Sequence, residues 1–218
     1  METAQIVLAV ISAVAMLVWL TGLQFLALSA RKGRPDPHDD LRNTGFQQGR
    51  SLAGRTEIDG QPSALSAKAA SILVKGDLFS LGPIKIAEKT DEHIVFERLE
   101  SGSQAAGSFR RGVFHFESIS QGRCRVEWMI ELTNMPWLLR LGALFQVLGI
   151  LAIAGGGWAI YTFVVSSPNP GMRWQTFQMV QVVHFLWPPF LFGGLYRRGI
   201  SMAAGQFEAF ANNLPYHE

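Results

Sequence analysis

The sequence predicts a membrane α-helical protein with three transmembrane helices and a small inserted α+β domain, one helix on an antiparallel meander. Three apolar stretches, at residues 4–28, 137–165 and 174–196, carry the membrane part of this prediction. Residues 141–165 and 174–196 contain no Asp, Glu, Lys or Arg. At about 1.5 Å per residue, each is long enough to cross the roughly 30 Å hydrocarbon core of a bilayer. A hydrophobic share of 48% beside 17% charged residues also fits a mixture of membrane and soluble parts.

The first stretch is interpreted as a retained anchor, because its apolar run exceeds the roughly 7–15 residues of a signal peptide and no Lys or Arg precedes it. Basic residues flank the stretches unevenly. They are Arg31, Lys32 and Arg34 after the first, Arg140 just before the uncharged part of the second (141–165), Arg173 between the second and third, and Arg197 and Arg198 after the third. By the positive-inside rule, we expect an integral protein of the bacterial inner membrane with an outside N-terminus and a cytoplasmic middle domain and C-terminus.

Residues 29–54, which contain prolines and clustered charges, are expected to form a linker. A cytoplasmic α+β domain is expected at 55–133. Its single helix, at about 62–75, begins at Pro62 and has Leu65, Ala69 and Leu73 at helical spacing. Four strands are indicated by apolar residues that alternate with polar ones: Ile84 and Ile86; Ile94 and Phe96; Phe114 and Phe116; and Val126, Trp128, Ile130 and Leu132.

This order of a short strand, a helix and a meander with an aromatic face resembles the START-like superfamily of helix-grip proteins, which includes polyketide cyclases and lipid-transfer proteins. The strand-to-helix entry at 57–62 and the strand ending at 125–128 carry the resemblance. It implies a cavity for a lipid or another hydrophobic ligand, lined here by Phe96, Phe114, Phe116 and Trp128. Members of the superfamily close the cavity with a long C-terminal helix. Here Pro136 and a membrane stretch follow instead, which predicts a truncated member.

Residues 199–214 have Ile200, Ala203, Phe207, Phe210, Ala211 and Leu214 along one face of a predicted amphipathic helix. Two interpretations are open. The helix lies at the cytoplasmic membrane surface, or it covers the open face of the small domain and replaces the helix that the START-like pattern lacks.

Two groups of residues in the membrane stretches predict helix contacts. Gly155, Gly156 and Gly157 permit close approach of another helix, either from a partner or from the same chain. Gln178, Gln181 and His184 recur at intervals of three and form a polar ribbon that is expected to face protein. Pro188 and Pro189 just beyond them predict a kink. His184 is a candidate axial ligand of haem or of a chlorophyll-type pigment, or else a hydrogen-bonding residue between helices, so the cofactor is left undetermined.

No catalytic set is evident, and we expect a protein without enzymatic activity. His115 and Glu117 share a strand face but have no nucleophile beside them. Cys124, the single cysteine, excludes an internal disulfide and multi-cysteine metal motifs, and we expect no metal site.

The leading hypothesis is an accessory or assembly subunit of a larger membrane complex, with membrane lipids and other transmembrane subunits as partners. The alternative is lipid or hydrophobic-ligand binding by a membrane-anchored START-like domain. Transport is disfavoured because the stretches lack acidic and basic residues at the bilayer midplane. A net charge of +2, with basic residues spread along the chain, gives no reason to expect nucleic acid as a partner.

Overall fold

The chain divides into two compact units that we describe separately. The computed structural model describes residues 3–32, 51–75, 84–98, 109–132 and 135–216, so most of the expected linker lies outside the described residues. The helical unit comprises Met1–Arg31 and Trp137–Leu195, and the sheet unit comprises Lys32–Pro136 and Tyr196–Glu218. The chain therefore contributes to the sheet unit twice, before and after the helical hairpin.

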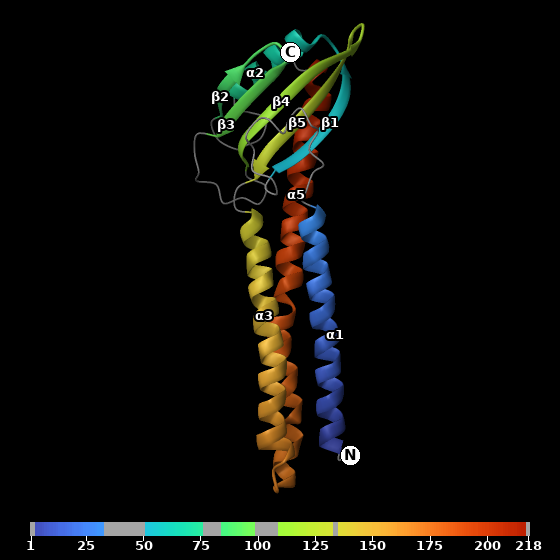
Figure 1. The fold of residues 1–218 in the computed structure, drawn as a ribbon, viewed down its shortest axis with the longest axis vertical. Helices are drawn as coiled ribbons and strands as arrows, with labels where there is room; N and C mark the ends of the chain where they lie inside the picture. The colour runs from blue at the N-terminus through green and yellow to red at the C-terminus, as the bar shows by residue number, and fades with distance from the viewer. Residues whose placement is uncertain (1–2, 33–50, 76–83, 99–108, 133–134, 217–218) are drawn as a thin grey trace. The chain divides into compact units, whose positions relative to one another are not determined.

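The sheet unit contains one five-stranded antiparallel sheet. Its strands are β1 (Ser51–Asp59), β2 (Ile84–Lys89), β3 (His93–Arg98), β4 (Phe109–Ser120) and β5 (Arg123–Leu132), in the spatial order β1-β5-β4-β3-β2. The register shifts between Ile86 and Glu88, and β4 has two further irregularities against β5. Bulges of this kind bend strands and increase their twist, which gives the sheet a concave inner face (Figure 1).

β1 is longer than the short strand expected from the sequence. It pairs with β5 over its whole length, from Ser51 opposite Glu131 to Asp59 opposite Arg123. The far end of this pair is closed by two turns, where the Gly60 N–H donates to the Gly122 carbonyl oxygen at 2.8 Å. Gly122 has a φ of 79° in the β4–β5 turn, a conformation that favours glycine.

Two helices cover the inner face of the sheet. α2 (Pro62–Lys75) buries Leu65, Ala69 and Leu73, and its Ser66 hydroxyl donates to the Thr90 carbonyl oxygen at 2.7 Å. The second cover is the part of α5 (Pro188–Asn213) that belongs to the sheet unit, followed by a short 3-10 turn, Leu214–Tyr216. Its apolar face is buried through Ile200, Ala203, Phe207, Phe210, Ala211 and Leu214.

Polar contacts hold this second helix in place. The Lys68 ammonium on α2 donates to the Pro215 carbonyl oxygen at 3.0 Å, and the Thr56 hydroxyl on β1 donates to Asn212 Oδ1. Of the two interpretations of residues 199–214, the structure therefore shows the one in which the helix covers the small domain. The sequence of residues 199–214 predicted a helix with one apolar face, and in the structure this face is buried against the aromatic inner face of the sheet.

The helical unit contains α1 (Thr3–Lys32) and α3 (Met135–Ile160), which continues as a π-helical turn, Tyr161–Val165. The chain returns through a 3-10 helix, Pro170–Val182, then α4 (Val183–Leu186) and the first turns of α5. The Asn169 side chain caps the 3-10 helix by accepting from the Gly171 N–H at 2.9 Å. A break at Trp187 separates α4 from α5, next to two prolines that lack backbone donors.

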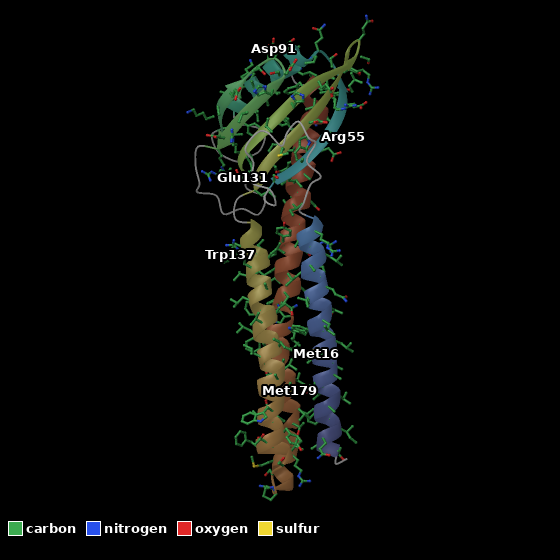
Figure 2. All side chains as sticks on the ribbon, viewed as in Figure 1. Met16, Arg55, Asp91, Glu131, Trp137 and Met179 are labelled. Carbon is green, nitrogen blue, oxygen red and sulfur yellow. The ribbon has the colours of Figure 1, made fainter. Side chains whose placement is uncertain are left out.

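These segments pack through a small apolar core. Its buried residues are Leu8, Ala15, Ile153, Val165, Met179, Val182 and Leu186, with Met16 partly buried against them (Figure 2). One hydrogen bond joins α1 to α3, from Trp19 Nε1 to the Gln146 carbonyl oxygen at 2.7 Å. Many large apolar side chains remain exposed, such as Val14 (54% exposed), Leu17 (63%) and Leu151 (61%).

The predicted fold class is wrong. The chain has an α+β helix-grip fold, a five-stranded sheet gripped by α2 and α5, and not a three-helix membrane domain that carries a four-stranded meander under one helix. Within the described residues, two helical segments, Thr3–Arg31 and Trp137–Val165, are long and apolar enough to cross a membrane. The third predicted span, 174–196, is divided among a 3-10 helix, α4 and part of α5. The break at Trp187 lies next to Pro188 and Pro189, which lack backbone donors.

Candidate ligand-binding interior of the sheet

The four aromatic residues singled out from the sequence lie together on the inner face of the sheet. Phe114 is directly opposite Trp128 across β4 and β5, Phe116 is opposite Val126, and Phe96 on β3 is opposite Gly112. Phe96, Phe114, Phe116 and Trp128 are each at most 2% exposed. The period-2 alternation of β3, β4 and β5 places them there, because residues two apart on a strand face the same side.

Rings from α5 fill the space above this face. Phe207 contacts Trp128 with ring centroids 5.6 Å apart, and stacks on Phe96 at 6.1 Å. Phe210 contacts Phe114 at 5.2 Å. Phe109, which begins β4, meets Phe207 edge-on at 5.3 Å. The interior is thus packed with aromatic rings at the separations that such pairs prefer. Side chains of α5 and β4 fill the space that the sequence predicted to be a ligand cavity.

Two glycines of the sheet make room for the largest rings. A Cβ atom on Gly54 would lie 2.4 Å from Cζ2 of Trp128, and one on Gly112 would lie 2.2 Å from Cζ of Phe96. Both distances are far below van der Waals contact, so any larger residue would displace the ring. Gly54 and Gly112 therefore set how deeply Trp128 and Phe96 sit in the interior.

Trp128 brings a polar group into this apolar interior. Its side chain is 2% exposed, and its indole Nε1 has no hydrogen-bond partner among the described residues. An unpaired buried donor costs roughly 1–3 kcal/mol, and for this reason buried indole N–H groups normally find an acceptor. A ligand that carries one acceptor atom would satisfy this donor.

Cys124 lies near the start of β5, on the inner face that also carries Trp128, and it is fully buried. Its Sγ donates to the Arg125 carbonyl oxygen at 3.5 Å. Burial raises the pKa of the thiol to about 11. The neighbouring Arg123 and Arg125 therefore do not activate Cys124, which is a structural residue of the interior.

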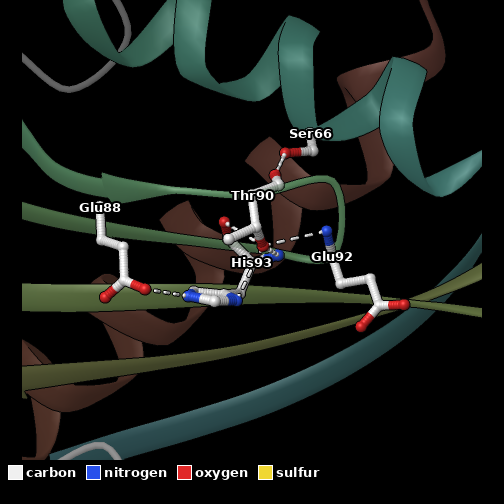
Figure 3. A network of polar contacts seen from close by, with 5 residues as sticks. All are labelled: Ser66, Glu88, Thr90, Glu92 and His93. Atoms are coloured by element: carbon white, nitrogen blue, oxygen red, sulfur yellow. Dashed lines mark hydrogen bonds and ion pairs between the residues drawn. The ribbon is translucent and has the colours of Figure 1, made fainter.

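The polar residues considered for catalysis lie on the opposite, outer face of the sheet. His93 is paired with His115 across β3 and β4. His93 Nε2 lies 2.9 Å from Glu88 Oε1, and its Nδ1 lies 2.8 Å from Thr90 Oγ1 (Figure 3). Glu117 accepts from Arg125 at 3.0 Å. These contacts are turn and surface ion-pair contacts. In the part of the chain that the structure describes, no three His, Cys, Asp or Glu side chains group together to hold a metal ion.

The residues predicted for intramembrane contacts divide into two sets in the helical unit. Gly156 lies against Met179 and Val182, and Gly157 against Met179 and Ser12, whereas a Cβ on Gly155 would meet nothing within 4 Å. Gly156 and Gly157 thus pack against side chains of the same chain. Gln178, Gln181 and His184 are exposed, and His184 Nε2 is 3.1 Å from Gln181 Oε1.

The order of elements decides the fold. One strand, a helix, a four-stranded antiparallel meander and a closing helix form a unit in which both helices cover the concave face. The sheet unit has a helix-grip fold. The closing helix of this grip comes after an inserted helical hairpin, so the sheet unit also includes residues beyond 55–133.

Comparisons with known proteins find limited structural similarity over part of the chain. No family model and no curated protein matches the sequence. A solved structure of Zhui aromatase/cyclase from Streptomyces sp. R1128 is similar over 38% of this chain and 67% of its own, with 11% identity and a TM-score of 0.25. TTHA0849 from Thermus thermophilus matches over 54% and 99%, with 14% identity and a TM-score of 0.25. Ara h 8.0201 matches over 65% and 97%, with 10% identity and a TM-score of 0.23.

Proposed function

We propose that the helix-grip unit binds a hydrophobic ligand that carries one hydrogen-bond acceptor, without catalysing a reaction on it. The observation that carries this proposal is the indole N–H of Trp128, which is buried in an aromatic interior without a partner among the described residues. The rings around Trp128 offer apolar contact for the body of such a ligand. The N–H offers a single directional contact for its polar atom, as is common in ligand sites.

Entry of the ligand requires Phe207 and Phe210 to move, because their rings occupy the space next to Trp128 and Phe114. Both rings belong to α5, whose cover over the sheet is held by the contacts of Lys68 with Pro215 and of Thr56 with Asn212. We propose that the ligand replaces these ring contacts and occupies the same face of the sheet. The closed interior is then the ligand-free state.

We further propose that α1 and α3 insert into a membrane, the bacterial inner membrane, and deliver the ligand from the bilayer. Their apolar side chains are largely exposed, and an exposed apolar surface of this extent is a liability in water. By the positive-inside rule, the basic residues beside them favour a cytoplasmic sheet unit and an outside N-terminus. Protease added to intact right-side-out cells should then leave the sheet unit uncut, and cleavage within it would refute this orientation.

Mass spectrometry of compounds extracted from the full-length protein, purified from its native membranes, tests the ligand proposal. The variant Trp128→Phe keeps the aromatic ring and removes the donor. We expect about tenfold lower retention of a co-purifying hydrophobic compound, since a hydrogen bond worth about 1.4 kcal/mol changes affinity tenfold. Trp137→Phe, at a position 58% exposed outside the interior, is the matched control and should retain it. If the wild type and Trp128→Phe retained equal amounts of the compound, Trp128 would not contribute to ligand binding.

A second candidate function is support of a membrane complex, favoured by the exposed polar ribbon of Gln178, Gln181 and His184. Polar side chains on an otherwise apolar surface are typical of contacts with another membrane protein. Replacement of His184 by Leu should then reduce co-purification of a partner subunit in mild detergent. Recovery of the wild-type protein without a stoichiometric partner would refute a role in a membrane complex and would not affect the ligand proposal.

A further inference from the structure

The helical unit contains a groove that the proposed ligand site in the sheet unit does not use. It runs between α1 and the segment that returns from α3, and it consists of two adjoining hollows. The first, of about 550 Å³, is lined by Thr3, Ala4, Val7, Arg173, Trp174, Thr176 and Phe177. The second, of about 250 Å³, is lined by Val10, Ile11, Val14, Ala15, Val18, Met179, Val180, Val182, Val183 and Leu186. One helical turn of α1 separates Val7 from Val10, so the two hollows follow the same pair of segments.

The chemistry of the groove changes along its length. The end at Thr3 and Thr176 carries the guanidinium of Arg173, whereas every side chain that lines the second hollow is apolar. Arg173 is the single Lys, Arg, Asp or Glu between Leu141 and Tyr196 in the sequence. Its Nε and Nη2 both donate to the Ser167 carbonyl oxygen at 3.4 Å, which holds the guanidinium at this end of the groove. A cationic entrance followed by an apolar trough matches an anionic amphiphile.

The length of the groove indicates which amphiphile fits. From Thr3 to Val18 the α1 helix rises about 22 Å, at 1.5 Å per residue. Half of a bilayer that is about 40–45 Å thick with its headgroups is about 20–22 Å. A groove of this length therefore reaches from the headgroup region to the bilayer midplane, with Arg173 at the level of the phosphates. Trp174, 65% exposed beside Arg173, is of the residue type that gathers at this interface.

We propose that this groove binds one anionic phospholipid of the surrounding bilayer, with its phosphate at Arg173 and one acyl chain against the exposed Val14, Val180 and Val183. A helix of another protein would have to present an apolar face to the trough and an acidic group to Arg173. The phospholipid provides both features in one molecule and is supplied by the membrane itself. The proposal rests on the membrane location of α1 and α3 and is independent of any ligand in the sheet unit.

Native mass spectrometry of the full-length protein in detergent, titrated with phosphatidylglycerol or with phosphatidylcholine of the same acyl chains, tests the proposal. We expect at least fivefold tighter binding of phosphatidylglycerol by the wild type, and loss of that preference in Arg173→Gln. Val14→Phe fills the trough and should weaken both lipids by at least fivefold. Leu17→Phe, on the same helix at an exposed position that does not line the groove, is the matched control and should bind as the wild type does.

Two further arms distinguish the sources of the binding. Glycerol 3-phosphate, which has the anionic group without acyl chains, should not compete at equal concentration, and competition by it would reduce the site to a phosphate contact. A photoreactive amino acid at Val14 should cross-link to lipid in native membranes. Cross-linking to a protein instead, equal affinity for both lipids, or equal effects of Val14→Phe and Leu17→Phe would each overturn the proposal. Membrane flotation of the wild type checks separately the membrane location on which the proposal rests.

Discussion

The sheet unit buries its large apolar side chains, whereas the helical unit leaves many of them exposed. In the sheet unit the large apolar residues turn inward, so that Phe96, Phe114 and Phe207 are each at most 1% exposed. In the helical unit α1 and α3 meet through a narrow core and leave residues such as Leu17 and Leu151 largely exposed. One unit buries its apolar side chains within itself, and the other leaves many of them exposed. The proposed ligand site rests on the first arrangement, and the proposed membrane insertion rests on the second.

The largest expected effect comes from removing a ring at the centre of the sheet unit. Phe207→Ala leaves a cavity between α5 and the sheet and should lower the free energy of unfolding by about 3–5 kcal/mol. Leu17→Ala, at a 63% exposed position of α1, should change it by less than about 0.5 kcal/mol. Hydrogen exchange of the full-length protein in detergent, read separately in β3–β5 and in α3, measures both effects. Equal losses for the two variants would mean that the two units do not differ in this way.

A smaller contrast is expected between two glycines. Gly112→Ala places a methyl group 2.2 Å from the Phe96 ring and should destabilise the sheet unit by about 1–3 kcal/mol. Gly155→Ala meets nothing within 4 Å on a helix and should be neutral or stabilise by up to about 1 kcal/mol. The midpoint of chemical unfolding followed in each unit reports the sign. A destabilising Gly155→Ala would indicate that Gly155 packs against something outside this chain.

The residues on the inner face of the sheet could be predicted from the sequence because apolar residues recur at every second position along the strands. In β3, β4 and β5 the residues of the inner face are aromatic or aliphatic, and many of the residues between them are His, Glu or Arg, so the pattern identifies Phe96, Phe114 and Trp128 as neighbours. Val95, Val113 and Met129 break the alternation and form a small buried cluster on the other face. The first half of β1, residues 51–54, has little alternation of its own. Its strand conformation follows from pairing with β5, a contact between residues far apart in the sequence.

The closing helix (199–214) and the third predicted span (174–196) show two structural features that the local sequence pattern could not predict. The apolar face of residues 199–214 was visible in the sequence, but the surface that buries it lies on strands placed before the hairpin. Residues 174–196 contain no Asp, Glu, Lys or Arg, so their hydropathy indicated one membrane span. They also lack a periodic pattern of apolar and polar residues that could have predicted the 3-10 helix or the break at Trp187. The unpaired indole of Trp128 depends on tertiary packing, and no sequence signal marks it.

The smallest expected effect concerns pH and should be confined to the sheet unit. Burial raises the pKa of Cys124 from 9.0 to about 11, so the folded protein binds the thiol proton more tightly than the unfolded chain does. Stability from this group is fully present below about pH 9 and falls as the pH rises through the interval from 9.0 to about 11. At about pH 10 the loss should be on the order of 1 kcal/mol.

The variant Cys124→Ala isolates this contribution, since other groups also titrate in the same interval. Chemical unfolding of wild type and variant at about pH 8 and about pH 10 should show a steeper loss for the wild type, seen in the strands and not in α3. The same burial should slow alkylation of Cys124 by iodoacetamide at about pH 8 in the folded protein, whereas an unfolded chain should react at the rate of a free thiol. Rapid alkylation under native conditions would mean that Cys124 is not protected by the packing of the interior.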